Sequence, residues 1–420
     1  MFLAAGMAHG RPVQSREARW ALRPWTAVGI SIFLIVGALA AALSGTVRAE
    51  VVQGLGTTGG VWRNATPAGS PSSRYAPVMA YEAASERLIL FSGQSHMNDT
   101  WSYDPNVNQW MNLDATGPPP PGYMGAPAMA YDTQAHRVIL FGVDWPWPNE
   151  TWAFDPAANL WTNLLPPASP SARHDASIAY DNLADRILLF GGGDVAPHHP
   201  YSSSNDTWSY SYVTNSWTQL HPAKSPDRRL GGAMVYDSTA DRVILFGGCA
   251  NGIDFTCTLM NDTWIYRYAS NEWTQVTPPV APSPRSFAAA AYDSRDDAVL
   301  LFGGADGQSV LNDTWTNSFF ENRWTNRTPS SSPPARRLGA MGYDPVRNQA
   351  ILFGGSLATG FTFMPTNDTW TYTLSAGGAS GAPTGELWLA PVLGLTAIAG
   401  LVVATVIWVL WRKAPRTNGP

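Results

Sequence analysis

The chain has 420 residues, a formal net charge of −5 and only 14% charged residues. A charge this mild, without a basic patch, gives no indication of a nucleic-acid partner. Its 19 tryptophans, 38 glycines and 34 prolines combine bulky aromatic side chains with turn-forming residues. That composition favours an all-β fold of many short strands joined by tight loops.

Residues 1–24 form a basic segment, in which arginines outnumber the single acidic residue, Glu17. An apolar run from Ala27 to Leu43 follows within residues 25–49. A basic flank before an apolar run is typical of an export signal, and the flank is expected to stay in the cytoplasm. The small residues around Ala49 suit cleavage as a signal peptide, whereas the length of the run also suits an uncleaved signal anchor. Both alternatives stay open.

Residues 50–374 repeat one pattern six times. Each copy has an apolar run that ends in Phe-Gly-Gly or a variant, then a loop of variable length, then a segment that ends in Thr-Trp. The clearest copy runs from Val243 to Gly248 and resumes at Asn261-Asp262-Thr263-Trp264. Successive copies lie 51, 56, 56, 51 and 55 residues apart, measured at Trp101, Trp152, Trp208, Trp264, Trp315 and Trp370. Self-similarity at such a period predicts a repeat array.

Each unit divides into four predicted strands, named a to d here. Strand a ends at a Tyr-Asp pair such as Tyr180-Asp181, and strand b is the apolar run, such as Ile187 to Phe190. An unbroken apolar run between turn signals suits a strand that is buried on both faces. Strand c begins at the Thr-Trp segment. Strand d carries a second tryptophan, at Trp62, Trp110, Trp161, Trp217, Trp273 and Trp324.

The first of these strand-d tryptophans precedes the first complete a–b–c set. The last set ends near Leu374 with no fourth strand after it. This offset predicts that residues 61–64, Val-Trp-Arg-Asn, pair with the strand around Trp370 and close a ring of six blades. Closure leaves only short, protected sheet edges.

The Gly-Gly doublet, the Tyr-Asp turn and the two spaced tryptophans stand in the order of the kelch repeat, which these units resemble. The resemblance covers about residues 61–374, and two copies depart from the doublet, at Ser92 and Val143. It implies a six-bladed kelch-type β-propeller, in agreement with the strand count.

Loops between strands b and c share one face of the predicted ring with the crossings from strand d to the next strand a. On this b–c/d–a face the b–c loops hold from 4 to 12 residues, whereas the turns of the opposite face are short and uniform. Variable loops on a rigid scaffold are where binding usually resides. Candidates to bind a protein or a glycan are the loop aromatics Trp145, Trp147, Tyr201, Phe361 and Phe363. The alternative is that they fold back and pack on the rim.

An arginine stands seven residues before the strand-a tyrosine in five units, at Arg74, Arg173, Arg229, Arg285 and Arg336, and Met124 replaces it in the second. These arginines are expected on the b–c/d–a face near the central channel. The resemblance to kelch proteins implies a grip on acidic ligands, so they join the candidate ligand-binding residues. The alternative is hydrogen bonding to carbonyl groups between blades, which we favour.

Cys249 and Cys257 lie in one loop of the fourth unit and are expected to form a disulfide if the compartment is oxidising. Asn64 and Asn326 begin glycosylation sequons outside the repeated motif and are glycosylation candidates. His198 and His199 prompt a comparison with the copper site of a kelch-type oxidase, but its cross-linked Tyr-Cys pair has no counterpart. We therefore expect no metal site and no cofactor.

Residues 375–386 are rich in glycine, serine and alanine and are expected to form a flexible linker. No charged residue interrupts residues 387–411, which at about 1.5 Å per residue exceed the roughly 30 Å hydrocarbon core. Trp388 and Trp411 suit the membrane interfaces, and a basic tail, residues 412–420, is expected in the cytoplasm. The sequence predicts a transmembrane helix here and hence a propeller held outside the cell membrane.

The leading hypothesis is a membrane-tethered extracytoplasmic module that recognises a protein or glycan through the b–c/d–a face, without catalysis. A carbohydrate-active enzyme, such as a sugar oxidase or a sialic-acid epimerase, is the alternative implied by the kelch resemblance. A purely structural envelope protein is a third reading. An acid, a base and a metal-binding cluster around the channel mouth would favour catalysis.

Overall fold

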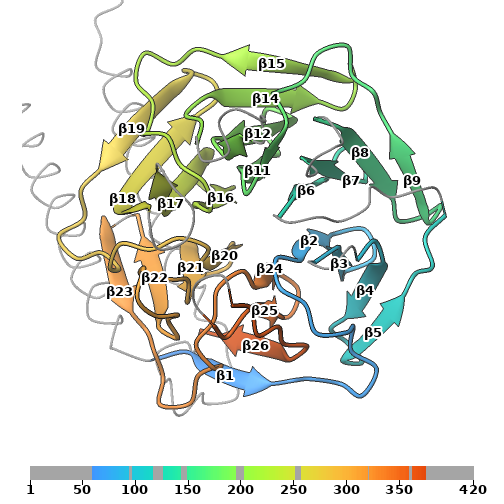
Figure 1. The fold of residues 1–420 in the computed structure, drawn as a ribbon, viewed down its shortest axis with the longest axis vertical. Helices are drawn as coiled ribbons and strands as arrows, with labels where there is room; N and C mark the ends of the chain where they lie inside the picture. Colours follow the sequence, from blue (N-terminus) through green and yellow to red (C-terminus); the bar gives the residue numbers. More distant parts are fainter. Residues whose placement is uncertain are drawn as a thin grey trace, which may run out of the picture. The chain divides into compact units, whose positions relative to one another are not determined.

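The computed structural model describes residues 59–93, 97–116, 126–142, 149–194, 203–250, 257–319, 321–358 and 362–374. Within these ranges the regular elements are strands, and helices are absent. Six four-stranded antiparallel sheets surround a central opening (Figure 1). The prediction of an all-β, six-bladed propeller is confirmed.

In each blade, strands a to d follow one another from the channel outward. Blade 1 holds β2 (Val78–Glu82), β3 (Arg87–Phe91), β4 (Thr100–Asp104) and β5 (Gln109–Asn112). Blade 2 holds β6 (Ala128–Asp132), β7 (Arg137–Phe141), β8 (Thr151–Asp155) and β9 (Leu160–Asn163). Blade 3 holds β11 (Ser177–Asp181), β12 (Arg186–Phe190), β14 (Thr207–Ser211) and β15 (Ser216–Leu220).

Blade 4 holds β16 (Ala233–Asp237), β17 (Arg242–Ala250), β18 (Thr258–Arg267) and β19 (Glu272–Val276). Blade 5 holds β20 (Ala289–Asp293), β21 (Ala298–Phe302), β22 (Thr314–Ser318) and β23 (Arg323–Asn326). Blade 6 holds β24 (Ala340–Asp344), β25 (Gln349–Phe353), β26 (Thr369–Thr373) and, from the other end of the repeats, β1 (Val61–Asn64). A small extra sheet pairs β10 (Arg173–His174) with β13 (Gly193–Asp194).

The ring is closed by β1, as the offset of the repeats predicts. β1 pairs antiparallel with β26, with Val61 opposite Thr373 and Asn64 opposite Trp370. Trp62 is only 3% exposed and its ring packs 5.0 Å from that of Phe302 in blade 5. The last blade is therefore completed by a strand from the opposite end of the propeller sequence.

Strand b of each blade is buried on both faces because it lies inside its sheet and between two neighbouring blades. In β3, Ile89 and Phe91 join the core shared with blade 2, whereas Leu88 and Leu90 join the core shared with blade 6. Alternate side chains of a strand point to opposite faces, so an unbroken apolar run supplies both cores. The expected two-sided burial of this strand is confirmed.

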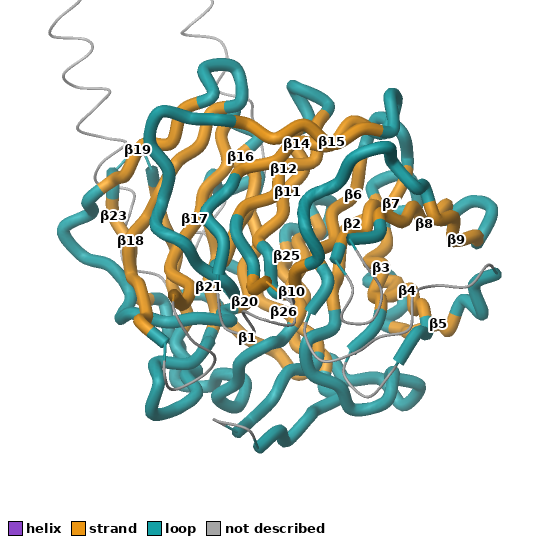
Figure 2. The backbone as a smooth tube through the Cα atoms, turned by 45° about the horizontal axis from the view of Figure 1, so that its top comes forward, coloured by secondary structure: helices purple, strands orange, loops and turns teal. Residues whose placement is uncertain are grey.

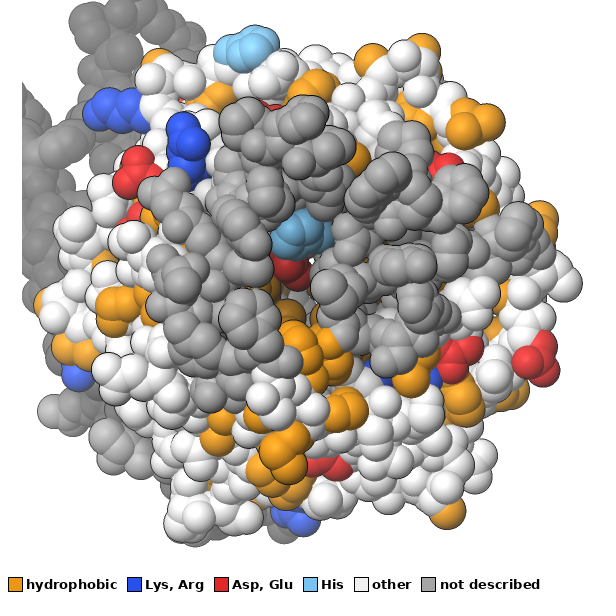
Figure 3. All heavy atoms as spheres, in the orientation of Figure 1, with side chains coloured by type: hydrophobic (Ala, Val, Ile, Leu, Met, Phe, Trp, Pro, Cys, Tyr) orange, Lys and Arg blue, Asp and Glu red, His pale blue; other side chains and the backbone are white. Residues whose placement is uncertain are grey.

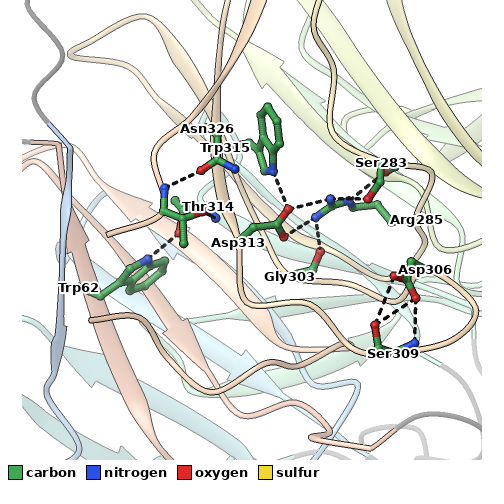
Figure 4. Close-up of polar contacts among 11 residues, drawn as sticks. Trp62, Ser283, Arg285, Gly303, Asp306, Ser309, Asp313, Thr314, Trp315 and Asn326 are labelled. Atoms are coloured by element: carbon green, nitrogen blue, oxygen red, sulfur yellow. Dashed lines mark hydrogen bonds and ion pairs between the residues drawn. The ribbon is translucent and has the colours of Figure 1, made fainter. Parts of the chain in front are cut away.

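A ring of hydrogen bonds joins neighbouring blades near the outer strands. In every blade the strand-d tryptophan donates its indole N–H to the strand-c threonine hydroxyl of the preceding blade, over 2.8–3.1 Å. The pairs are Trp62–Thr314, Trp110–Thr369, Trp161–Thr100, Trp217–Thr151, Trp273–Thr207 and Trp324–Thr263. Figure 4 shows the pair at the seam, Trp62 and Thr314. The recurring threonine of the motif is therefore an inter-blade acceptor.

Blade 4 differs from its neighbours at the b–c connection, where the sequence predicts a loop. β17 and β18 run on past the Gly-Gly doublet as a longer hairpin, with Cys249 opposite Leu259 and Ala250 opposite Thr258. A bulge between Phe246 and Gly248 absorbs the change of register. Figure 2 shows the long strands β17 and β18 beside the shorter strands of the other blades. Part of this predicted loop is therefore sheet.

The predicted segments 1–24, 25–49, 375–386, 387–411 and 412–420 lie outside the described residues. Among the residues that are described, none belongs to a helix with the length and apolar character needed to cross a bilayer. Export, the linker and the membrane helix stay predictions from the sequence.

Candidate functional site

The five repeated arginines bind aspartates within their own blades. In blade 4, the Arg229 guanidinium contacts both carboxylate oxygens of Asp262, at 2.6 and 2.8 Å, and donates to the carbonyl of Gly247 at 2.9 Å. We call this arginine–aspartate ion pair a clamp. The same clamp joins Arg74 to Asp99, Arg173 to Asp206, Arg285 to Asp313 and Arg336 to Asp368. Figure 4 shows the copy in blade 5, where Trp315 also donates to Asp313.

In four of these pairs the arginine lowers the pKa of its aspartate. Burial alone would raise the pKa of Asp262, but the hydrogen bonds and positive charge of Arg229, with the indole N–H of Trp264, hold that pKa below its ordinary value. The pKa values of Asp99, Asp206 and Asp368 are lowered by the same contacts against the same burial. These four carboxylates are therefore ionised partners of their arginines at neutral pH.

The backbone of each arginine lies against the preceding blade, while its side chain holds its own blade. Arg229 accepts a hydrogen bond from Gly192 N, and Arg285 accepts one from Gly248 N, both at 2.9 Å. A Cβ on Gly191 or Gly247 would lie 2.5 or 2.7 Å from an arginine carbonyl oxygen, so the first glycine of the doublet permits this close approach. These arginines tie adjacent blades together.

This placement removes the arginines from the candidate ligand contacts. All five are at most 2% exposed, and their guanidinium groups are used by aspartate and carbonyl oxygens. An acidic ligand at the surface would have to displace a buried ion pair to reach them. The favoured alternative, hydrogen bonding to carbonyl groups, is correct in part, because the guanidinium groups donate to carbonyls of their own blade and only the backbone of these arginines bonds to the preceding blade. The aspartate is an additional partner that the sequence reasoning missed.

The second blade departs from this pattern at two positions. Met124 stands at the arginine position in the sequence, and Glu150 stands where the other blades have aspartate. Glu150 accepts the indole N–H of Trp152 at 2.8 Å, as the aspartates do in the other blades. Because both members of the pair change in the same unit, this was the sequence signal that could have identified the clamp.

The mouth of the channel is lined by the residue two positions after each arginine, or after Met124. These residues differ from blade to blade: Ala76, Ala126, Asp175, Gly231, Phe287 and Leu338. Together with the strand-a residues that follow, they surround a cavity of about 190 Å³. Asp175 is the single charged residue among the described residues of its lining.

Backbone hydrogen bonds run around this mouth from blade to blade. Five N–H groups donate to the mouth residue of the preceding blade over 2.8–3.0 Å, namely those of Ala76, Asp175, Gly231, Phe287 and Leu338. At the sixth position, Ala126 N donates to the Asp175 carboxylate at 3.1 Å. The mouth is therefore held by bonds that use the N–H group of every residue in it.

Five of the six mouth residues, all except Ala126, adopt backbone torsions that bulky residues seldom take. Phe287 has φ 57° and Leu338 has φ 58°, in the left-handed region, where Gly231 occupies the equivalent position of blade 4. Such torsions are unusual for large side chains and cluster at functional sites. A Cβ on Gly231 would meet the Phe287 ring at 2.6 Å, so this ring lies over that glycine.

Asp175 is paired with its neighbour His174. Its Oδ2 lies 2.6 Å from His174 Nδ1, and both side chains are partly exposed. Figure 3 shows a histidine beside an acidic side chain at the centre of the ring, next to apolar side chains. Neither residue was singled out from the sequence, because a single His-Asp step in one of six repeats has no distinguishing pattern.

Residues 26–225 and 182–377 match the family model described as the KLHDC2/KLHL20/DRC7 Kelch-repeats domain. The chain belongs to the kelch-repeat family. It is 31% identical to the flagellar outer-arm dynein alpha chain of Chlamydomonas reinhardtii over 168 residues, which are 37% of this chain and 4% of that protein.

Two further relatives are similar to this chain over longer stretches. The leucine-zipper-like transcriptional regulator 1 homolog of Drosophila melanogaster is 25% identical over 204 residues, 45% of this chain and 19% of that protein. An F-box/kelch-repeat protein of Arabidopsis thaliana is 26% identical over 237 residues, 52% of this chain and 44% of that protein. The chain spans less than half the length of each of these relatives.

Of the aromatic candidates of this kelch propeller, Phe363 is the one within the described residues. Its ring stacks on Tyr75, with centroids 3.9 Å apart and planes at 3°, and the Arg337 guanidinium lies 5.1 Å from its centroid. Phe363 thus packs on the rim while remaining partly exposed. Trp145, Trp147, Tyr201 and Phe361, like His198 and His199, lie outside the described residues.

The structure joins Cys249 and Cys257 by a disulfide at the end of the blade 4 hairpin, with Cα atoms 5.6 Å apart. Backbone N–H and carbonyl groups of Cys249 also exchange two hydrogen bonds of 3.0 Å with Leu230. The disulfide therefore lies beside the crossing that leads to the channel mouth.

The sequon asparagines Asn64 and Asn326 end strand d, and each accepts a hydrogen bond from the backbone N–H two residues later. Asn112 and Asn163 make the same turn without being sequons. The turn therefore accounts for an asparagine at this position. Glycosylation of Asn64 and Asn326, both exposed, stays a prediction.

Proposed function

We propose that this chain is a membrane-tethered, extracytoplasmic kelch propeller that binds a protein through its b–c/d–a face. Kelch propellers commonly bind proteins. The observation that carries the proposal for this chain is the contrast between a repeated scaffold and an unrepeated channel mouth. Clamps and tryptophan–threonine pairs recur around the ring, whereas the residues at the mouth differ in size and charge from blade to blade.

The opposite face offers no such contrast. There, the acidic residue that ends strand a accepts backbone hydrogen bonds from the turn that follows, for example Asp181 from Leu183 and Ala184, and Asp237 from Thr239 and Ala240. These turns are built alike and use their polar groups internally. Recognition of a specific partner needs a surface whose side chains differ around the ring, and the channel-mouth side has such a surface.

The membrane tether and the extracytoplasmic location are supported by the sequence of the two ends. The uncharged residues 387–411 with their basic tail, and the basic flank before the first apolar run, both favour a propeller on the outside. Protease added to intact cells is expected to digest the propeller while sparing a cytoplasmic control protein. Complete protection of the propeller in unbroken cells would refute this topology.

Partner binding is tested by a pull-down and a glycan array with the purified chain. We expect a protein partner to be captured, and capture to be lost when Trp145 and Trp147 are both changed to alanine. Capture that survives this double change would exclude that loop. Binding to the glycan array instead, without a protein partner, would contradict the proposal in favour of a glycan ligand.

The channel mouth gives little support to the alternative of a carbohydrate-active enzyme. Catalysis would be favoured by an acid, a base and a metal-binding cluster around the channel mouth, but among the described residues that line the channel Asp175 is the single charged one. His174 and Asp175 are explained by the local pairing and by the bond to Ala126.

A further inference from the structure

The mouth of the channel presents hydrogen-bond acceptors, because its backbone N–H groups are already bonded within the protein. Every mouth residue donates its N–H group, five to the carbonyl of the preceding blade and Ala126 to Asp175. The carbonyl oxygens keep a second lone pair each, and the Asp175 carboxylate has about four acceptor positions. A ligand at this point must therefore bring donors.

Two of the acceptor positions of Asp175 are occupied. Ala126 N–H donates to Oδ1, and Oδ2 is paired with His174 Nδ1, for which a neutral imidazole protonated on Nδ1 suffices. The two contacts hold the carboxylate at the mouth and leave some of its hydrogen-bond acceptor positions unoccupied by these partners. Its side chain is largely buried, with 10% exposed, and Asp175 lines the cavity, so the accessible part of this residue faces the channel mouth.

The cavity suits one long side chain. Its volume of about 190 Å³ is below the roughly 300–1,000 Å³ of a pocket for a drug-sized ligand. Its walls include Phe287, Leu338 and the small residues Ala76 and Gly231. Apolar walls with a single anionic acceptor match a side chain that has an apolar stem and a cationic tip.

We propose that the channel mouth binds a lysine or arginine side chain from the protein partner, with its cationic group on Asp175 and its stem against Phe287 and Leu338. This inference rests on the proposed protein binding through the b–c/d–a face. It predicts that the partner presents a basic residue to the channel mouth and not an acidic one. The five repeated arginines, which could have bound an acidic ligand, are already paired with aspartates. Acidic peptides find no free donor among the described residues of the mouth.

The test is selection of short random peptides displayed on phage by the purified full chain. We expect the enriched peptides to share a lysine or arginine at one position. With a synthetic peptide of that consensus, Asp175→Asn should raise Kd about tenfold to a hundredfold, the usual range for losing a hydrogen bond to a charged group. Asparagine keeps an oxygen for Ala126 N–H and tolerates the positive φ of 52° at this position, so the fold should be retained.

Asp227→Asn is the matched control, since Asp227 is exposed and lies outside the lining of this cavity. It makes the same change of charge and should leave Kd unchanged. Replacing the basic residue of the peptide by methionine should cost little further affinity in Asp175→Asn, because the two changes remove the same contact. Additive losses would overturn the proposed contact.

The outcomes separate this inference from the function on which it rests. Enriched peptides without a basic residue, or with an acidic consensus, would overturn the inference while protein binding stands. Equal losses in Asp175→Asn and Asp227→Asn would show a general charge effect and also overturn it. Failure to enrich any peptide, together with a negative pull-down, would count against both.

Discussion

Ring closure by β1 can be tested with two tryptophans in matching surroundings. Trp62 in β1 lies at the seam, is 3% exposed, and packs 4.9 Å from Tyr372 and 5.0 Å from Phe302. Trp273, in β19 of blade 4, is 2% exposed and packs 5.0 Å from Tyr266 and 5.1 Å from Phe190. The two residues differ in that β1 alone joins its blade from the far end of the propeller sequence.

Changing either tryptophan to alanine removes a buried ring and a hydrogen bond. Such changes cost about 3–5 kcal/mol in free energy of unfolding, which includes the roughly 0.5–1.5 kcal/mol of the indole–threonine bond. Against the typical 5–15 kcal/mol stability of a domain, this is a large fraction. Because the contacts of the two tryptophans match, Trp62→Ala and Trp273→Ala should lower the free energy of unfolding by similar amounts.

The assay is denaturant unfolding followed by circular dichroism, combined with limited proteolysis. Both variants should show a lower midpoint, but only Trp62→Ala should release β1 for early cleavage near residue 64, because only that strand is held to its blade without a neighbouring turn. A wild-type midpoint for Trp62→Ala beside a lowered one for Trp273→Ala would refute closure by β1. Equal early cleavage near residue 64 in both variants would refute the special role of the seam.

Two further perturbations address the bonds that recur around the ring. Arg229→Met should lower the free energy of unfolding by about 1–3 kcal/mol at neutral pH, because the Asp262 carboxylate, whose side chain is 21% exposed, loses the hydrogen bonds of its partner. Since the pKa of Asp262 is lowered in the folded chain, the stabilisation by this pair is present above the ordinary carboxylate pKa of about 4 and is lost as pH falls through the folded pKa. The difference in free energy of unfolding between variant and wild type should therefore shrink in acid. A difference that stays constant with pH would contradict this. Thr207→Val keeps the shape but leaves the Trp273 indole N–H unpaired, and it should cost about 1–3 kcal/mol by denaturant titration, whereas an unchanged midpoint would mean that the bond contributes nothing.

The architecture could be predicted because each unit repeats the residues that its blade requires. The apolar run of strand b, the tryptophan of strand d and the offset of Trp62 each follow from local rules of strand burial and ring closure. The partner of a buried arginine depends instead on which segments meet in space. Arg229 and Asp262 are 33 residues apart, and their contact exists only after strands β17 and β18 have paired.

The channel mouth was less predictable for the same reason. Asp175 belongs to blade 3, but its carboxylate accepts a hydrogen bond from Ala126 N–H of blade 2. Its importance comes from being the one charge among the described residues of a wall that six units build together. No single repeat contains that information. The extension of β17 to Ala250 was likewise hidden, because a disulfide-linked hairpin end and a loop have similar composition.

The second unit shows how repeats can reveal a contact without a family alignment. Five units keep both arginine and aspartate, and the one that loses the arginine to Met124 also carries glutamate, Glu150, in place of the aspartate. A structural pair is released from selection on either member once one is lost, so joint departure within one chain indicates contact. The same unit adjoins Asp175, whose carboxylate binds Ala126 where the other blades use a backbone carbonyl. The departure from the repeated scaffold and the single charge among the described residues of the channel mouth therefore fall together at blades 2 and 3. If the proposed partner binds this face, these two features are expected to set its orientation.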